Sequence, residues 1–269
     1  MTGLPTRIAS IADRWPKGLA LLLGLISATG FAPLNLWPLT LLAFAGWMLL
    51  VARSPRGARA FGIGWAFGVG HFALGLNWIA TAFTYQAAMP AWLGWIAVVL
   101  LSLYLAVYPA LAAWGAWMVR RCAAAAPQRA DGAPRALPFA RITWSFLLSF
   151  AALWIVTEWL RAWVFTGFAW NPLAAVSLAG NLAGILGENY LATIGTYGVS
   201  GVVIIWCGVI TASIEECAIL GDFKRRGISD PRNRSDLAGT PLKEFDTRRF
   251  AKFLAFGAGL FVLMMVAGL

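Results

Sequence analysis

Two ionisable residues stand three apart inside an apolar segment, Glu158 and Arg161 in the run Thr157-Glu158-Trp159-Leu160-Arg161. Charged groups within a bilayer are costly, so they are candidates for a functional role. On a helix, a spacing of three places both side chains on one face, where they can pair. Two interpretations stay open. The pair neutralises itself near the membrane surface, with Arg161 reaching toward the headgroups, or Arg161 also receives a phospholipid phosphate, whose geometry a guanidinium matches.

The other reactive side chains stand apart from one another. His71 is the single histidine, and with no acid near it in sequence we expect a structural role rather than that of a general base. The cysteines Cys122, Cys207 and Cys217 fit no metal-binding spacing. Cys207 falls in an apolar run and is predicted to be a small core residue. Hydrolase, zinc-protease and phosphate-loop motifs are missing, so the residues themselves predict no catalytic residue, no metal and no cofactor.

The composition determines which class of protein carries these residues. Hydrophobic residues make up 60% of the 269 positions and charged residues 12%, against about 25% charged in soluble domains. The 15 tryptophans and 17 phenylalanines are typical of membrane–water interfaces. A net charge of +10 is also seen in nucleic-acid-binding proteins. Here the basic residues form clusters between apolar runs, so we expect no nucleic-acid partner.

We therefore expect an all-α fold, a polytopic transmembrane helix bundle of about seven spans. The apolar runs can each cross much or all of ~30 Å of hydrocarbon. Their predicted bounds are residues 18–31, 37–52, 60–83, 91–119, 142–165, 191–214 and 250–269. A cytoplasmic N-terminus would place every Lys and Arg except Arg161 on the cytoplasmic side, as the positive-inside rule requires, and the C-terminus in the periplasm.

The domain organisation follows from these runs. It comprises a cytoplasmic N-terminus (1–17), a six-span membrane domain (18–214), a basic cytoplasmic linker (215–249) and a seventh span (250–269).

Several segments, in this order, resemble the apolipoprotein N-acyltransferase family. They are Gly30-Phe31-Ala32-Pro33, Leu76-Asn77-Trp78-Ile79, Glu158-Trp159-Leu160-Arg161, Phe165-Thr166-Gly167-Phe168-Ala169-Trp170-Asn171-Pro172 and Tyr197-Gly198-Val199-Ser200. The resemblance extends over residues 18–214. One departure is Ala169, where the family pattern leads us to expect proline.

The resemblance implies an acyltransferase of the bacterial inner (cytoplasmic) membrane that uses no cofactor. Its acyl donor would be a membrane phospholipid, and its acceptor the N-terminal diacylglyceryl-cysteine of bacterial lipoproteins. The family places its catalytic Glu, Lys and Cys in a nitrilase-like domain after the seventh span, and this sequence ends at Leu269. We therefore expect a truncated or split chain that does not N-acylate lipoproteins by itself. The alternative is a non-enzymatic multi-span membrane protein, a transporter or an assembly subunit, that shares the scaffold.

We also expect a lipid-binding groove near the outer membrane surface. Its candidate residues lie at the outer ends of the third and fifth spans and in the loop after the fifth. They are Trp78, Glu158, Trp159, Arg161, Phe165, Trp170 and Asn171. An ordinary aromatic belt at the interface would explain the aromatic members equally well.

Overall fold

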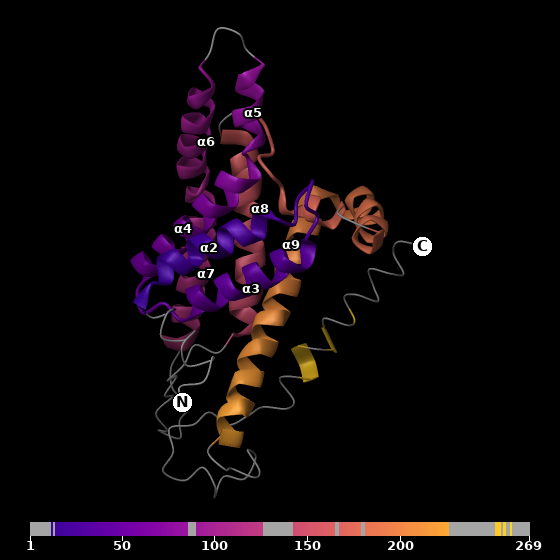
Figure 1. Cartoon of the computed structure of the whole chain (residues 1–269). Coiled ribbons are helices and arrows are strands. Elements are labelled where there is room, and N and C mark those ends of the chain that lie inside the picture. The colour runs from indigo at the N-terminus through magenta and orange to yellow at the C-terminus, as the bar shows by residue number, and fades with distance from the viewer. Residues whose placement is uncertain are drawn as a thin grey trace, which may run out of the picture.

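The described part of the chain consists of helices. The computed structural model describes residues 12, 14–85, 90–125, 142–164, 167–178, 181–225 and a few positions between 251 and 259. In chain order the elements are α2 (Pro16–Ala28), α3 (Trp37–Ala52), α4 (Gly57–Gly75), α5 (Trp78–Thr84), α6 (Ala91–Leu105), α7 (Val107–Ala125), α8 (Trp144–Val164), the 3-10 helix η1 (Leu173–Leu178) and α9 (Asn181–Arg225). No strand occurs among these residues, which confirms the predicted all-α bundle (Figure 1).

The helices match the first six predicted spans. Among the described residues, three helices are long and apolar enough to cross a membrane, Ala91–Ala123, Trp144–Val164 and Leu191–Ala218. The pair α4 and α5 meets the same criterion only when taken together, and it bends by 42° at the break. The first two predicted spans correspond to the shorter apolar helices α2 and α3. The predicted seventh span lies largely outside the described residues, so the number of spans stays a prediction.

Prolines begin the two short helices. Pro16 and Pro38 occupy the first turns of α2 and α3, where a missing backbone N–H costs nothing because that N–H has no partner within the helix. At the other boundary of the membrane region, α9 does not end at residue 214 but continues to Arg225. Near its beginning the helix is broken at Gly195, whose φ of 71° lies in the left-handed region that glycine adopts at little cost.

The centre of the bundle is a cluster of aromatic side chains from three helices. Trp47 of α3 stacks on Phe67 of α4 with ring centroids 4.1 Å apart, and Phe44 packs edge-on against Phe67 and against Trp154 of α8. All four of these side chains are buried. Burial of such large rings stabilises the contact between α3, α4 and α8.

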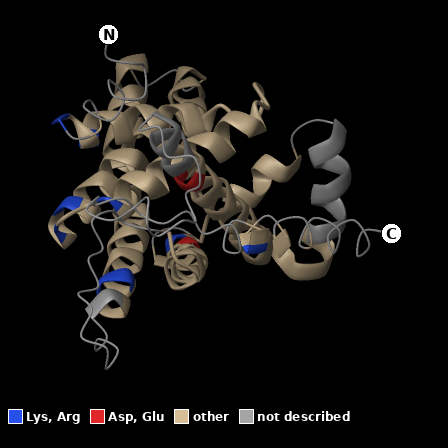
Figure 2. Ribbon diagram, turned by 90° about the horizontal axis from the view of Figure 1, so that it is seen from below, with Lys and Arg blue, Asp and Glu red and all other residues tan. Residues whose placement is uncertain are grey.

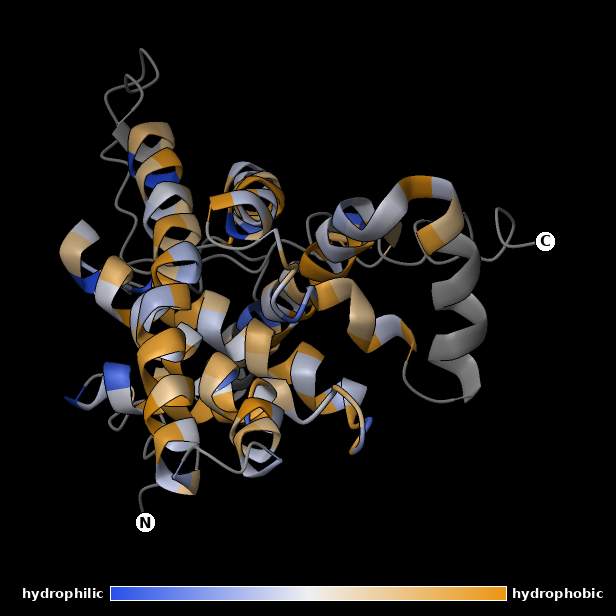
Figure 3. Ribbon diagram, turned by 90° about the horizontal axis from the view of Figure 1, so that it is seen from above, coloured by the Kyte–Doolittle hydropathy of each residue, from blue (hydrophilic) through white to orange (hydrophobic). Residues whose placement is uncertain are grey.

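The outside of the bundle is also apolar. Large exposed hydrophobic side chains include Trp95 and Leu100 on α6 and Val156 and Trp163 on α8. Figure 3 shows hydrophobic residues on the outer faces of the helices as well as between them. Soluble proteins rarely expose such continuous apolar surface, whereas a lipid environment requires it.

The basic segments gather at one end of the bundle, which we call the basic end. There Trp117 of α7 donates a hydrogen bond to the carbonyl of Ser54 before α4 (2.8 Å), and the Arg121 guanidinium lies 5.7 Å from the Trp117 ring. Figure 2 looks at the bundle from this side. Residues of this end comprise Lys17, Arg53, Arg56, Arg59, Arg120 and Arg121. The ends of α4 and α8 that carry Gly75 and Arg161 lie at the opposite end, which we call the Arg161 end.

Candidate functional site

The Arg161 end holds a buried ion pair on α8. The Nη2 atom of Arg161 lies 3.7 Å from Oε1 of Glu158, and both side chains are only 1% exposed. The spacing of three on one helix face therefore produces the predicted pair. The arginine is enclosed by protein, however, and does not extend to the surface as one of the two interpretations required.

Two N–H groups bind the Glu158 carboxylate more closely than the arginine does. Nε1 of Trp154, one turn earlier on α8, donates to Oε2 at 2.9 Å. The backbone N–H of Leu173, at the start of η1, donates to Oε1 at 2.9 Å. The carboxylate thus holds the segment that follows α8 against the helix. Hydrogen bonds to an ionised acceptor are stronger than those between two neutral groups.

Arg161 binds the same segment from its other side. Its Nη2 donates to the carbonyl of Asn171 at 3.4 Å, and its guanidinium carbon lies 5.0 Å from the ring centroid of Phe72 on α4. Its Nε and the Nδ2 atom of Asn171 are buried, and neither donates a hydrogen bond to an acceptor among the described residues. The guanidinium thus retains one donor for a further acceptor.

The segment between α8 and η1 has an unusual backbone. Trp170 and Asn171 have φ angles of 39° and 55°, in the left-handed region that asparagine tolerates and tryptophan seldom adopts. Asn171 also lies so close to α4 that a Cβ on Gly75 would overlap its Nδ2. Glu158, which accepts a hydrogen bond from Leu173 N, and Arg161, which donates one to the Asn171 carbonyl, hold this conformation in place.

The predicted groove residues divide into three groups. Glu158, Arg161 and Asn171 come together in the network, and the partly buried Trp170 packs against the cluster that contains Phe72. Trp78 and Trp159 are about half exposed, at 51% and 46%, on the outside of the same end. Phe165 lies outside the described residues.

Sequence reasoning missed the partner of His71. Its Nδ1 lies 2.7 Å from the Oγ of Ser27 on α2, and both residues are buried. Aromatic rings surround the imidazole, with Phe44 and Phe72 packed edge-on against it. The two residues are 44 positions apart, so no local motif joins them. The enclosed, hydrogen-bonded ring fits the structural role that we expected.

The cysteines do not join this network. Cys207 is fully buried in the core, as predicted, while Cys122 and Cys217 are exposed. Within the described ranges no three His, Cys, Asp or Glu residues gather as metal ligands. What the Arg161 end supplies chemically is positioning: a fixed charge, a fixed loop and exposed aromatic rings around them.

An α-helical bundle with an apolar exterior and its charged pair buried at one end defines an α-helical membrane protein. Comparison with known proteins narrows the class. Residues 23–209 match the model of the apolipoprotein N-acyltransferase N-terminal domain, and the chain belongs to this family.

Similar proteins carry the same family name. The apolipoprotein N-acyltransferase of Ralstonia nicotianae is 36% identical over 202 residues, which cover 75% of this chain and 35% of that protein. Its counterpart in Chromobacterium violaceum is 37% identical over 182 residues, covering 65% of this chain and 31% of the relative. The chain thus spans about a third of the length of the curated relatives that it matches.

Proposed function

We propose that this chain is the membrane domain of an apolipoprotein N-acyltransferase, a multi-pass protein of the bacterial inner membrane with its basic end in the cytoplasm. The relatives bear that enzyme's name, and the grouping of the basic segments at one end supports the orientation. A membrane phospholipid would be the acyl donor, and bacterial lipoproteins the acceptors.

The role of the bundle in this reaction is to present a lipid-facing groove at the Arg161 end. The observation that carries this proposal is the buried network of Glu158 and Arg161, which holds Trp170 and Asn171 in a strained backbone conformation. Strain that neighbouring residues maintain is a frequent feature of ligand-binding sites. Trp78 and Trp159 lie on the exterior of the same end and would contact the lipid.

Site-specific photo-crosslinking tests this groove. A photoreactive amino acid replaces Trp78 or Trp159 in the chain in the inner membrane, and Leu148 serves as the control. Leu148 is 50% exposed on α8, the helix of Trp159, but lies near its basic end. We expect lipoprotein adducts at Trp78 and Trp159 and none at Leu148. Equal adducts at all three positions, or none, would contradict a substrate groove at this end.

Activity is tested separately in a strain depleted of its own acyltransferase. Acyl transfer needs a nucleophile, a base and an oxyanion site, and Cys207, the one thiol of the described bundle interior, is enclosed by the core. We expect the 269-residue chain alone to leave lipoproteins diacylated, as mass spectrometry of their N-termini would show. Triacylated product that disappears in Cys207→Ser would refute this expectation.

A further inference from the structure

A groove runs between α2 and α4 and begins at the basic end, with Lys17 among its lining residues. It has a volume of about 460 Å³ and is lined by Lys17, Gly18, Leu21, Phe61, Gly62, Trp65, Ala66 and Val69. Pockets of a few hundred Å³ are the usual size for small-molecule ligands. Apart from the Lys17 ammonium, these side chains are apolar.

The groove exists because two parallel helices touch and then separate. Gly24 of α2 packs on the Phe67 carbonyl of α4, and Gly70 of α4 packs on the Leu21 carbonyl of α2, so closely that a Cβ on either glycine would overlap the facing backbone. Toward the beginning of both helices, the Lys17 side chain and not the α2 backbone faces Gly62. The groove is lined by residues of α2 and α4 around this position.

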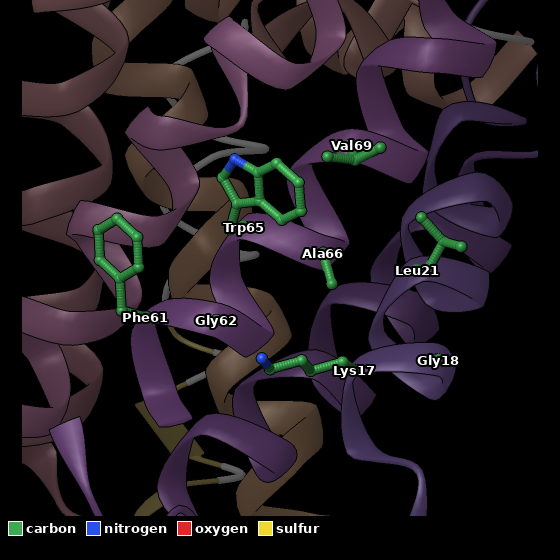
Figure 4. Close-up of a pocket in the computed structure, with 8 residues that line it drawn as sticks. All are labelled: Lys17, Gly18, Leu21, Phe61, Gly62, Trp65, Ala66 and Val69. Atoms are coloured by element: carbon green, nitrogen blue, oxygen red, sulfur yellow. The ribbon is translucent and has the colours of Figure 1, made fainter. Parts of the chain in front are cut away.

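A hydrogen bond to α6 holds one wall of the groove. Trp65 is 38% exposed, and its Nε1 donates a hydrogen bond to the carbonyl of Leu103 on α6 at 3.2 Å. Figure 4 shows Trp65, Ala66 and Val69 along one side and Leu21 along the other. From Gly62 to Val69 the apolar wall extends about 10 Å along α4, which accommodates the upper part of an acyl chain.

The charged end of the groove is positive. In Figure 4 the Lys17 side chain crosses the floor of the groove toward Gly62, and a Cβ on Gly62 would lie 2.8 Å from its Cε. Neither α2 nor α4 contains an acidic residue, and Arg59 lies one turn before Gly62. Both helices also begin at this end, where the helix dipole is positive. Asp13, the nearest acid in sequence, lies outside the described residues.

We propose that this groove binds one anionic phospholipid of the cytoplasmic leaflet, with its phosphate at Lys17 and an acyl chain between Leu21 and Trp65. The groove is positive at one end and apolar beyond it, which matches the headgroup and the acyl chain of a phospholipid. This site goes beyond the proposed acyl transfer and shares with it only the membrane orientation. The lipid would be a bound structural component, separate from the acyl donor.

The test uses the purified 269-residue chain in phosphatidylcholine nanodiscs that contain a small fraction of a probe lipid. The probe carries a photoreactive acyl chain and is phosphatidylglycerol, phosphatidylcholine or diacylglycerol. Mass spectrometry maps the crosslinks to residues 17–21 and 61–69. We expect phosphatidylglycerol to label these residues about fivefold more than phosphatidylcholine, the preference expected from one lysine beside an anionic lipid.

Matched variants identify the cause of this preference. Lys17→Gln should reduce phosphatidylglycerol labelling to the phosphatidylcholine level, whereas Lys252→Gln, also at an exposed lysine, should not. Gly62→Leu should block labelling by every probe, whereas Ala58→Leu, at an exposed position of the same helix, should leave it unchanged. If Gly62→Leu does not fold, Lys17→Gln decides, because the Lys17 side chain is exposed.

Three results would overturn the proposal. They are equal labelling by phosphatidylglycerol and diacylglycerol, a headgroup preference that survives Lys17→Gln, and displacement of the lipid by excess inorganic phosphate, which would indicate a free-phosphate site. None of these readouts requires acyl transfer. A negative result here would therefore not contradict the proposed function, and a failure of the proposed function would not contradict this lipid site.

Discussion

The substitution Glu158→Gln tests whether the buried network holds the Arg161 end together. It keeps the size of the side chain but removes its charge. The carboxylate has four polar neighbours: Trp154 Nε1 and Leu173 N at 2.9 Å, Arg161 Nη2 at 3.7 Å, and the Ser200 hydroxyl. The side-chain oxygen of glutamine can still accept a hydrogen bond from one of the two N–H groups. Its NH₂ group then faces the other N–H group, and two donors cannot form a hydrogen bond with each other.

The expected loss follows from these contacts. One charge-assisted hydrogen bond contributes about 1.5–3 kcal/mol, and removing one partner of a buried ion pair costs about 3–5 kcal/mol, because the other charge is left uncompensated. The separation of 3.7 Å makes the ion pair a weaker contact than either of the two N–H hydrogen bonds at 2.9 Å. We therefore expect Glu158→Gln to lower the free energy of unfolding by about 3 kcal/mol.

A double-mutant cycle separates the charge effect from lost packing. Arg161→Met removes the guanidinium while keeping an extended apolar side chain. In the double variant Glu158→Gln/Arg161→Met no buried charge is left alone, so the two losses should overlap by about 1–3 kcal/mol. Unfolding is measured by SDS titration of the purified chain in mixed micelles, followed by tryptophan fluorescence.

Thr157→Val is the matched control. Thr157 is buried next to Glu158, and its hydroxyl donates only to the carbonyl of Trp154. We expect this variant to lose no more than about 1 kcal/mol. If Glu158→Gln is as stable as Thr157→Val, or if the two losses in the cycle simply add, the network does not stabilise this end and the reasoning fails.

Three further outcomes are expected. Gly70→Leu should destabilise the chain by about 3 kcal/mol or more by forcing α2 and α4 apart, whereas Gly18→Ala, which has open space around it, should change the SDS midpoint little. A membrane-impermeant maleimide should label Cys122 from the cytoplasmic side only, and Cys207 only after unfolding, because the first is exposed and the second buried; labelling of Cys122 from the periplasm would reverse the orientation. Reporter fusions after Leu269 should be active in the periplasm if seven spans are present, and activity restricted to the cytoplasm would require a different number.

The all-α fold and the positions of six helices could be predicted from the sequence, because apolar length and proline positions are local properties. The Glu158–Arg161 pair was predictable for the same reason, since the spacing of three on one helix decides it. The bend between α4 and α5 at Leu76 and Asn77 was not predicted, because the apolar run continues through it.

Contacts between distant segments could not be predicted. The Ser27–His71 hydrogen bond joins two helices that lie side by side only because Gly24 and Gly70 allow their backbones to touch. Glycine pairs are common in membrane helices, and the sequence does not say which of them meet. Likewise, Arg161 is buried because the segment after α8 and helix α4 pack against it. The sequence of α8 alone does not determine the positions of either.

The burial of Arg161 has a structural cause in the membrane. Glu158 lies 14 positions after Trp144, so about 21 Å along α8, within the ~30 Å hydrocarbon depth if α8 begins at the membrane surface. In that placement, the segment 171–174 that packs against the pair would also lie at membrane depth, where every backbone polar group needs a partner inside the protein.

The network supplies those partners one by one. The Glu158 carboxylate accepts from Leu173 N, the Ser200 hydroxyl accepts from Ala174 N, and Arg161 donates to the Asn171 carbonyl. A hydrophobic residue at position 158 or 161 would leave one of these backbone groups unsatisfied, at about 1–3 kcal/mol each. Glu158, Arg161 and Ser200 together thus do for residues 171–174 what helical hydrogen bonds do for the helices, and they allow an irregular segment to follow α8 at the end where we propose the lipid-facing groove.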